Sequence, residues 1–103
     1  MTVKRLLMAM ALAGAFWAGS VSAQGGYESA IYDACARYGC DGGQLVRVMY
    51  CESGGDPGAI GAQGELGIFQ VNPYIWGYMD SWQQIEFAAH MFATGQGYYW
   101  VCQ

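Results

Sequence analysis

One glutamate lies at the end of an apolar, helix-like segment and is the residue best suited to acid–base chemistry. The segment Gln44–Ser53 is rich in Leu, Val, Met and Tyr, and it closes with Cys51, Glu52 and Ser53 before two glycines. In a helix, Glu52 lies near the C-terminus, where backbone carbonyls carry partial negative charge. That charge and burial both disfavour a carboxylate, so we expect a raised pKa for Glu52. A carboxyl group protonated near neutral pH is the proton donor that glycosidic bond cleavage needs.

Two predicted helices precede and contain this residue. Apolar residues recur at three- and four-residue spacing over Tyr27–Tyr38, and Gly39 is a natural C-terminal stop. The residues just before, Gln24–Gly26, are expected to form a flexible lead-in. The segment Gln44–Ser53 is apolar on most sides and is predicted to be the central buried helix, with Asp41 as its cap.

A third helix is predicted over Trp82–Thr94. Ser81 has the character of an N-cap, with Gln84 three residues later. Between the second and third helices the chain is rich in glycine. Residues 56–64 are expected to be loop, and residues 65–73 are ambiguous between a strand and a helical turn.

The first 23 residues have the pattern of a secretory signal peptide. Lys4 and Arg5 precede the apolar run Leu6–Ala18, and small residues follow at Val21-Ser22-Ala23. The run is shorter than the roughly 20 residues of a membrane span. We expect cleavage after Ala23, which leaves residues 24–103 as one domain that is secreted, either extracellular or in the cell envelope. An uncleaved N-terminal anchor is the alternative.

The residues after Ala23 are strongly acidic. They keep all eight Asp and Glu residues, but only Arg37 and Arg47 as basic ones. Such a surface repels phosphate backbones, so we expect no nucleic acid partner. No basic amphipathic helix is left to bind an anionic membrane, and we expect a monomer with no stable membrane insertion after signal cleavage.

All four cysteines follow the predicted cleavage site, and an even number in a small secreted chain predicts two disulfides. Zinc is the alternative. However, the chain has a single histidine, His90, and the cysteine spacings lack the short pairs of zinc sites, so we expect no metal. Three pairings are possible. We favour Cys35–Cys40, which closes a local loop, and Cys51–Cys102, which would hold Glu52 close to the end of the chain.

A second carboxylate and several aromatic residues are further candidates for the site. The possible second carboxylates are Asp56, Glu65, Asp80 and Glu86. Glu65 is the best placed because it adjoins a glycine-rich, strand-like segment, and a plain surface position is the alternative. Trp76 and Tyr78 flank Gly77 in a loop and are the candidates for contact with sugar rings. Packing in the core or over its edge is preferred for Trp82 and Trp100, and a structural or surface position for His90.

Two ordered motifs carry a resemblance to a known family. Residues 51–57 read Cys-Glu-Ser-Gly-Gly-Asp-Pro, and residues 64–73 read Gly-Glu-Leu-Gly-Ile-Phe-Gln-Val-Asn-Pro. This order resembles the soluble lytic transglycosylase domain of the lysozyme-like superfamily, which has a Glu-Ser pair at a helix end and then a Gly-Leu-Met/Phe-Gln segment. Residues 88–92 and 100–102 resemble the closing helix and Trp-x-Cys end of compact secreted members.

The resemblance implies a small, disulfide-bonded lysozyme-like fold of the α+β class, predominantly helical, with peptidoglycan glycan strands as the partner. It makes Glu52 the catalytic acid and Ser53 its neighbour at the helix end. It places Gln70 in the substrate cleft and Phe69 where the family often has methionine. The family's Tyr-Asn-Ala-Gly segment has no counterpart here.

The expected reaction cleaves the MurNAc-GlcNAc β-1,4 bond without metal or cofactor. In a lytic transglycosylase one carboxyl group protonates the leaving oxygen and then takes the proton of the muramic acid C6 hydroxyl, which closes a 1,6-anhydro ring. One strong glutamate without a convincing partner favours this mechanism. A hydrolytic muramidase, which needs a second carboxylate, and a secreted peptidoglycan-binding module without activity are the alternatives. A small disulfide-rich inhibitor or toxin fits the sparse cysteines poorly.

Overall fold

The computed structural model describes residues 23–102. Their order is α1 (Ala23–Tyr38), α2 (Gly42–Ser53), α3 (Pro73–Trp76), α4 (Ser81–Ala93) and the 3-10 turn η3 (Gly97–Tyr99). The predicted signal peptide lies outside the described residues, apart from Ala23. No helix within residues 23–102 combines the length and the apolar character that crossing a membrane requires.

The prediction of a predominantly helical fold is confirmed, but the α+β prediction is not. Residues 23–102 contain only two isolated bridges, which join Leu66 to Ile60 and to Val71. Leu66 and Val71 exchange both backbone hydrogen bonds, at 3.1 and 3.0 Å. The chain between them makes a tight turn in which Gly67 and Gln70 have positive φ angles, so the pair does not extend into a ladder.

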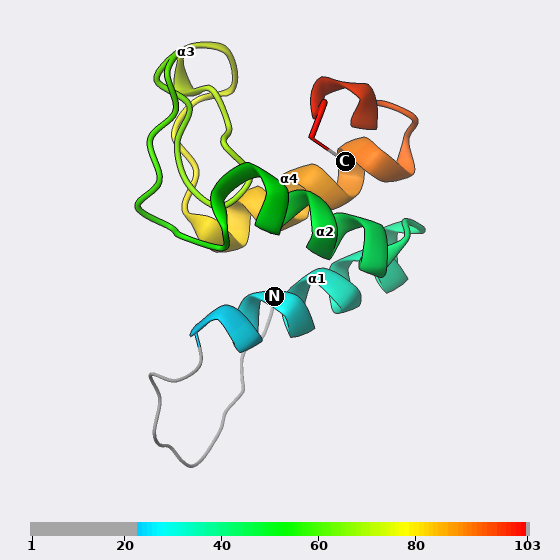
Figure 1. Cartoon of the computed structure of the whole chain (residues 1–103). Coiled ribbons are helices and arrows are strands. Elements are labelled where there is room, and N and C mark those ends of the chain that lie inside the picture. Colours follow the sequence, from blue (N-terminus) through cyan, green and yellow to red (C-terminus); the bar gives the residue numbers. More distant parts are fainter. Residues whose placement is uncertain (1–22, 103) are drawn as a thin grey trace.

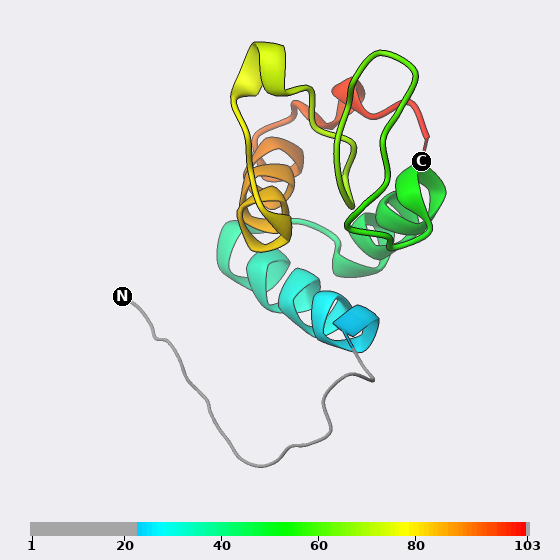
Figure 2. The same cartoon turned by 90° about the vertical axis from the view of Figure 1, so that its left-hand side faces the viewer.

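Helix α1 packs against both α2 and α4 and lies beneath them in Figure 1. The loop between α2 and α4, which carries α3, rises on the opposite side of α2 and α4 from α1, as Figure 2 shows. Side chains from the helices and from residues 68–71 form one core, whose fully buried members include Ile31, Leu45, Val48, Met49, Ile68 and Phe69.

Helix α1 begins earlier than predicted. Residues 24–26, expected to be a flexible lead-in, belong to its first turn. The cause is tertiary packing, because Tyr27 is buried and its ring meets that of Trp82 on α4 edge-on, with centroids 5.0 Å apart. A side-chain carbon at Gly26 would lie 3.8 Å from the same indole, so this turn already contacts α4.

Helix α2 is closed at both ends by the residues that the sequence indicates. The Asp41 carboxylate accepts a hydrogen bond from the Gln44 backbone N–H at 3.1 Å, as an N-cap does. At the other end Gly54 adopts a left-handed conformation, with φ of 69°, and donates to the Tyr50 carbonyl. The helix therefore stops directly after Glu52 and Ser53.

Helix α4 begins at Ser81, one residue earlier than predicted, and it has a different cap. Asp80 is the N-cap, and it forms a reciprocal capping box with Gln83. The predicted pair of Ser81 and Gln84 is wrong. Gln84 is 2% exposed and faces the loop, where its oxygen accepts from the Phe69 backbone N–H at 2.8 Å. Its amide nitrogen donates to the carbonyls of Leu66 and Met79.

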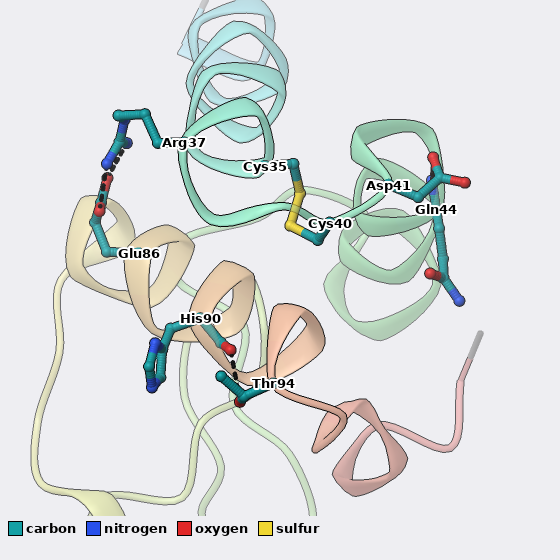
Figure 3. Close-up of a disulfide and its surroundings, with 8 residues drawn as sticks. All are labelled: Cys35, Arg37, Cys40, Asp41, Gln44, Glu86, His90 and Thr94. Atoms are coloured by element: carbon teal, nitrogen blue, oxygen red, sulfur yellow. Dashed lines mark hydrogen bonds and ion pairs between the residues drawn. A yellow bond between two sulfur atoms is a disulfide. The ribbon is translucent and has the colours of Figure 1, made fainter.

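Both favoured disulfide pairings are confirmed, with Cα–Cα distances of 4.5 Å for Cys35–Cys40 and 5.8 Å for Cys51–Cys102. Figure 3 shows the first, which ties the end of α1 to the turn before α2. The same view shows Arg37 of α1 paired with Glu86 of α4, with N–O distances of 3.0 and 2.5 Å. These links hold α1 against its two neighbours.

Candidate active site

Glu52 lies in the last turn of α2, and its neighbour Ser53 fixes that turn to the loop. The Ser53 hydroxyl is within hydrogen-bonding distance of the Ile68 carbonyl, at 2.8 Å, and of the Met49 carbonyl, at 3.2 Å. It also accepts from the Gly55 backbone N–H at 3.0 Å. The end of α2 is therefore attached to the 66–71 turn, which forms part of the wall opposite Glu52.

A cavity of about 390 Å³ lies over Glu52. One side is formed by the glycine-rich loop and the 66–71 turn, and the other by α3, α4 and the C-terminal segment. The predicted site residues Glu65, Gln70 and Trp76 line it together with Glu52, and further lining comes from Gly61, Ala62, Val71, Asn72, Ile75, Phe87, Met91, Tyr99, Trp100 and Val101.

The surroundings of Glu52 raise the pKa of its carboxyl group, as the sequence predicts. Partial burial is the largest cause, because desolvation disfavours the charged form. The backbone N–H of Cys102 donates a hydrogen bond to the carboxylate and acts in the opposite direction. The negative charge of Glu65 raises the pKa further. The net effect favours a carboxyl group that keeps its proton to a higher pH than an ordinary glutamate.

Glu65 faces the same cavity, so the structure brings the two glutamates together. Its carboxylate accepts from the Gln63 backbone N–H at 2.9 Å, which fixes the carboxylate in the loop. A side-chain carbon placed on Gly61 would lie 2.5 Å from both the Glu65 and the Gln70 side-chain oxygens. A larger residue at position 61 would displace these two oxygens from their present positions at the cavity.

Gln70 is held in a conformation that side chains rarely adopt, with a φ angle of 52°. Its amide nitrogen donates to the carbonyls of Ala59, at 3.2 Å, and Gly67, at 3.0 Å. These bonds fix the side chain across the loop and leave its oxygen turned toward Gly61. A strained backbone that surrounding contacts hold in place is typical of functional sites.

Aromatic rings form the wall on the side of α3 and α4. Trp76 packs against Phe87, with centroids 5.1 Å apart, and meets Tyr99 edge-on at 5.6 Å. Trp100 is 6% exposed, and its indole N–H donates to the Phe69 carbonyl at 2.8 Å. The core role predicted for Trp100 is confirmed, although part of its surface also lines the cavity.

Three of the predicted substrate-binding residues do not line the cavity. The Ser53 hydroxyl is bonded within the helix end, and Phe69 is completely buried behind the wall, where its ring meets that of Trp100. Tyr78 is 80% exposed and lies outside the cavity lining. The binding roles of these three residues stay predictions.

The sequence reasoning missed several lining residues, above all Asn72, Phe87 and Tyr99. Asn72 caps α3 by accepting from the Tyr74 backbone N–H, so the Asn-Pro dipeptide was a usable signal for a turn at the cavity. Phe87 and Tyr99 carry no such signal, because their positions depend on how α4 and the C-terminal segment fold over the loop.

In the part of the chain that the structure describes, no group of three His, Cys, Asp or Glu side chains gathers as metal ligands would. The side chains at the cavity offer a carboxyl group with a raised pKa, a second carboxylate, an amide and an aromatic wall.

A comparison with protein-family models, with curated proteins and with solved structures finds no match for this chain.

Proposed function

We propose that the protein is a lytic transglycosylase that cleaves the MurNAc-GlcNAc β-1,4 bond of peptidoglycan, with Glu52 as its general acid and base. The observation that carries the proposal is the raised pKa of Glu52 in a cavity walled by Trp76, Tyr99 and Trp100. Sugar rings present apolar C–H faces that pack on aromatic rings. A protonated carboxyl group beside such a wall has the surroundings that glycosidic bond cleavage needs.

In the proposed reaction the Glu52 carboxyl group gives its proton to the oxygen of the bond being cleaved. The resulting carboxylate then takes the proton of the muramic acid C6 hydroxyl, whose oxygen bonds to C1 and closes the 1,6-anhydro ring. The Cys102 N–H supports the second step, because a hydrogen bond to the carboxylate stabilises the form that acts as base. The burial that raises the pKa supports the first.

One observation favours a hydrolytic muramidase as a second candidate. Glu65 shares the cavity and is close enough for its charge to raise the pKa of Glu52. A hydrolase uses such a carboxylate either to activate water or to form a covalent intermediate. However, the Glu65 carboxylate accepts a hydrogen bond from the Gln63 N–H, so a structural role in the loop is enough to explain this residue. For this reason we place the transglycosylase first.

The mass of the products decides between the two reactions. Purified protein without the leader is incubated with cell walls, and the released fragments are analysed by mass spectrometry. A transglycosylase gives fragments that end in 1,6-anhydro-muramic acid, whereas a hydrolase adds one water to each. Fragments carrying the added water would replace the first proposal with the second, and walls that bind the protein without being cut would indicate a binding module.

A further inference from the structure

The Cys51–Cys102 disulfide links two residues that each adjoin the proposed acid. Cys51 precedes Glu52 in the last turn of α2, and Cys102 follows Val101, which lines the same cavity as Glu52. The Cys102 backbone N–H also acts on the Glu52 carboxylate as a hydrogen-bond donor, which lowers the pKa of that group. Figure 2 shows the end of the chain beside the last turn of α2. The bond therefore holds a hydrogen-bond donor against the carboxyl group, in addition to joining two segments that are 51 residues apart.

The C-terminal segment is anchored up to Trp100 without the help of this disulfide. The Trp100 indole N–H is bonded to the Phe69 carbonyl, and its ring packs against Phe92 and Phe87 at 5.4 and 6.0 Å. Beyond that point Val101 is 91% exposed and adds little packing. Opening the disulfide would thus free residues 101 and 102 while the core stays closed.

We propose that the Cys51–Cys102 disulfide is a positioning element for Glu52, so that full turnover requires the oxidised bond although the fold does not. The proposal rests on the proposed function of Glu52. It implies that the chain reaches full activity only in an oxidising compartment, because the Cys102 N–H meets the carboxylate only when the segment is tied down. When this disulfide is reduced, the chain stays folded but the Glu52 carboxyl group is no longer fixed by the Cys102 N–H.

The redox step is an ordinary thiol–disulfide exchange. A dithiol reductant supplies two electrons and two protons. The bond between the two sulfurs breaks, Cys51 and Cys102 become thiols, and the sulfurs of the reductant form a disulfide in their place. Reoxidation reverses each of these changes, which makes the effect on turnover testable in both directions.

The second disulfide provides a matched control. Cys35–Cys40 lies between the end of α1 and the turn before α2, and neither of its cysteines is adjacent in sequence to a residue that lines the cavity. A protein with Cys35→Ser and Cys40→Ser keeps the link at Glu52, and a protein with Cys51→Ser and Cys102→Ser loses only that link. Both double variants have no unpaired thiol, so differences between them report on the position of the bond.

Kinetics and an amide titration test the proposal together. We expect the Cys51→Ser/Cys102→Ser protein to keep its far-ultraviolet circular dichroism and its KM for cell walls, while kcat falls by about 10- to 100-fold, as misplacement of a reacting group by about 1 Å does. The Cys35→Ser/Cys40→Ser protein keeps its kcat. Dithiol treatment of that control lowers its kcat to the same extent, and reoxidation restores it.

The NMR signal of the residue 102 amide gives a readout that is independent of turnover. In the oxidised protein it is expected to shift as Glu52 titrates, and the shift is lost in Glu52→Gln and in the Cys51→Ser/Cys102→Ser protein. The proposal would be overturned if the residue 102 amide signal of the oxidised protein did not shift as Glu52 titrates. It would also be overturned if kcat of the Cys51→Ser/Cys102→Ser protein were unchanged, or if its kcat fell because the protein unfolded. An oxidised protein whose amide titrates but which cuts no wall would instead overturn the proposed function.

Discussion

The hydroxyl group of Ser53 lies 2.8 Å from the backbone carbonyl oxygen of Ile68. This contact joins the end of helix α2, which carries Glu52, to the turn that carries Gln70. Ile68 is completely buried, so water cannot reach its carbonyl oxygen and take the place of the Ser53 hydroxyl group. The Ser53 hydroxyl group therefore helps to fix the position of the acid relative to the 66–71 turn.

Replacing Ser53 with alanine is expected to lower the free energy of unfolding by about 1–3 kcal/mol, the cost of leaving a buried acceptor without a partner. Urea denaturation measures the change. Ser29→Ala, at an exposed position of α1, is the control and is expected to change stability by about 0.5 kcal/mol or less. Equal effects of the two substitutions would show that the contact with Ile68 contributes nothing.

Gln84 holds the other side of the same loop, because its side chain bonds to backbone groups of Phe69, Leu66 and Met79. Gln84→Ala leaves the buried Phe69 N–H without its partner, whereas the Leu66 carbonyl keeps the bond from the Val71 N–H and Met79 is only half-buried. We expect the free energy of unfolding to fall by about 1–3 kcal/mol, the cost of one buried unpaired group. Gln63→Ala, at an exposed loop position, is the control. A loss at Gln84 no larger than at Gln63 would contradict the structure of this loop.

The charge of Glu65 raises the pKa of Glu52, so removing it must lower that pKa. Proton donation needs the protonated acid, and kcat/KM falls as pH rises through the pKa of Glu52. In Glu65→Gln this fall is therefore expected to begin at a lower pH than in the wild-type protein, with activity retained under acidic conditions. Asp33→Asn, which removes an exposed charge from α1, leaves the profile unchanged.

The Glu65→Gln variant also distinguishes the transglycosylase from the hydrolase. Glutamine retains an oxygen that can accept from the Gln63 N–H, so the loop keeps its bond. If Glu65 is the second carboxylate of a hydrolase, Glu65→Gln abolishes activity at every pH. Complete loss in a folded protein would thus contradict the single-carboxylate mechanism.

Trp76 and Tyr78 are both predicted to contact sugar rings, but they differ in their position relative to the cavity. Trp76 lines the cavity, whereas Tyr78, two residues later, lies outside its lining. Trp76→Ala is expected to raise KM for cell walls by roughly 5- to 10-fold, equivalent to about 1 kcal/mol of aromatic contact. Tyr78→Ala is expected to leave KM unchanged. The reverse order would place the sugar outside the cavity, and thermal unfolding of both variants checks that the fold is kept.

Parts of this structure could be predicted from the sequence because their signals are local. Asp41 and Gly54 define helix α2 through a side-chain cap and a left-handed turn, and both depend only on neighbouring residues. The apolar helix and the place of Glu52 at its C-terminus indicated a carboxyl group with a raised pKa, and the direction is confirmed, with burial as the largest cause.

The remainder depends on contacts between segments distant in sequence. The role of Gln84 could not be predicted, since a glutamine on a helix gives no sign of the loop that it meets. Glycines at the start of α1 suggested flexibility, yet packing of Tyr27 on Trp82 outweighs their low helix propensity. The α+β expectation was not confirmed, because the 66–71 turn closes on itself instead of pairing along a strand.

The most direct test of the account is the release of soluble fragments from cell walls by the wild-type protein and by Glu52→Gln. Glutamine has the shape of the protonated acid but cannot give up or take the proton, so the fold and wall binding are expected to persist. The account predicts that the wild-type protein releases fragments ending in 1,6-anhydro-muramic acid and that folded Glu52→Gln releases none. Release of the same fragments at the wild-type rate by Glu52→Gln would contradict it.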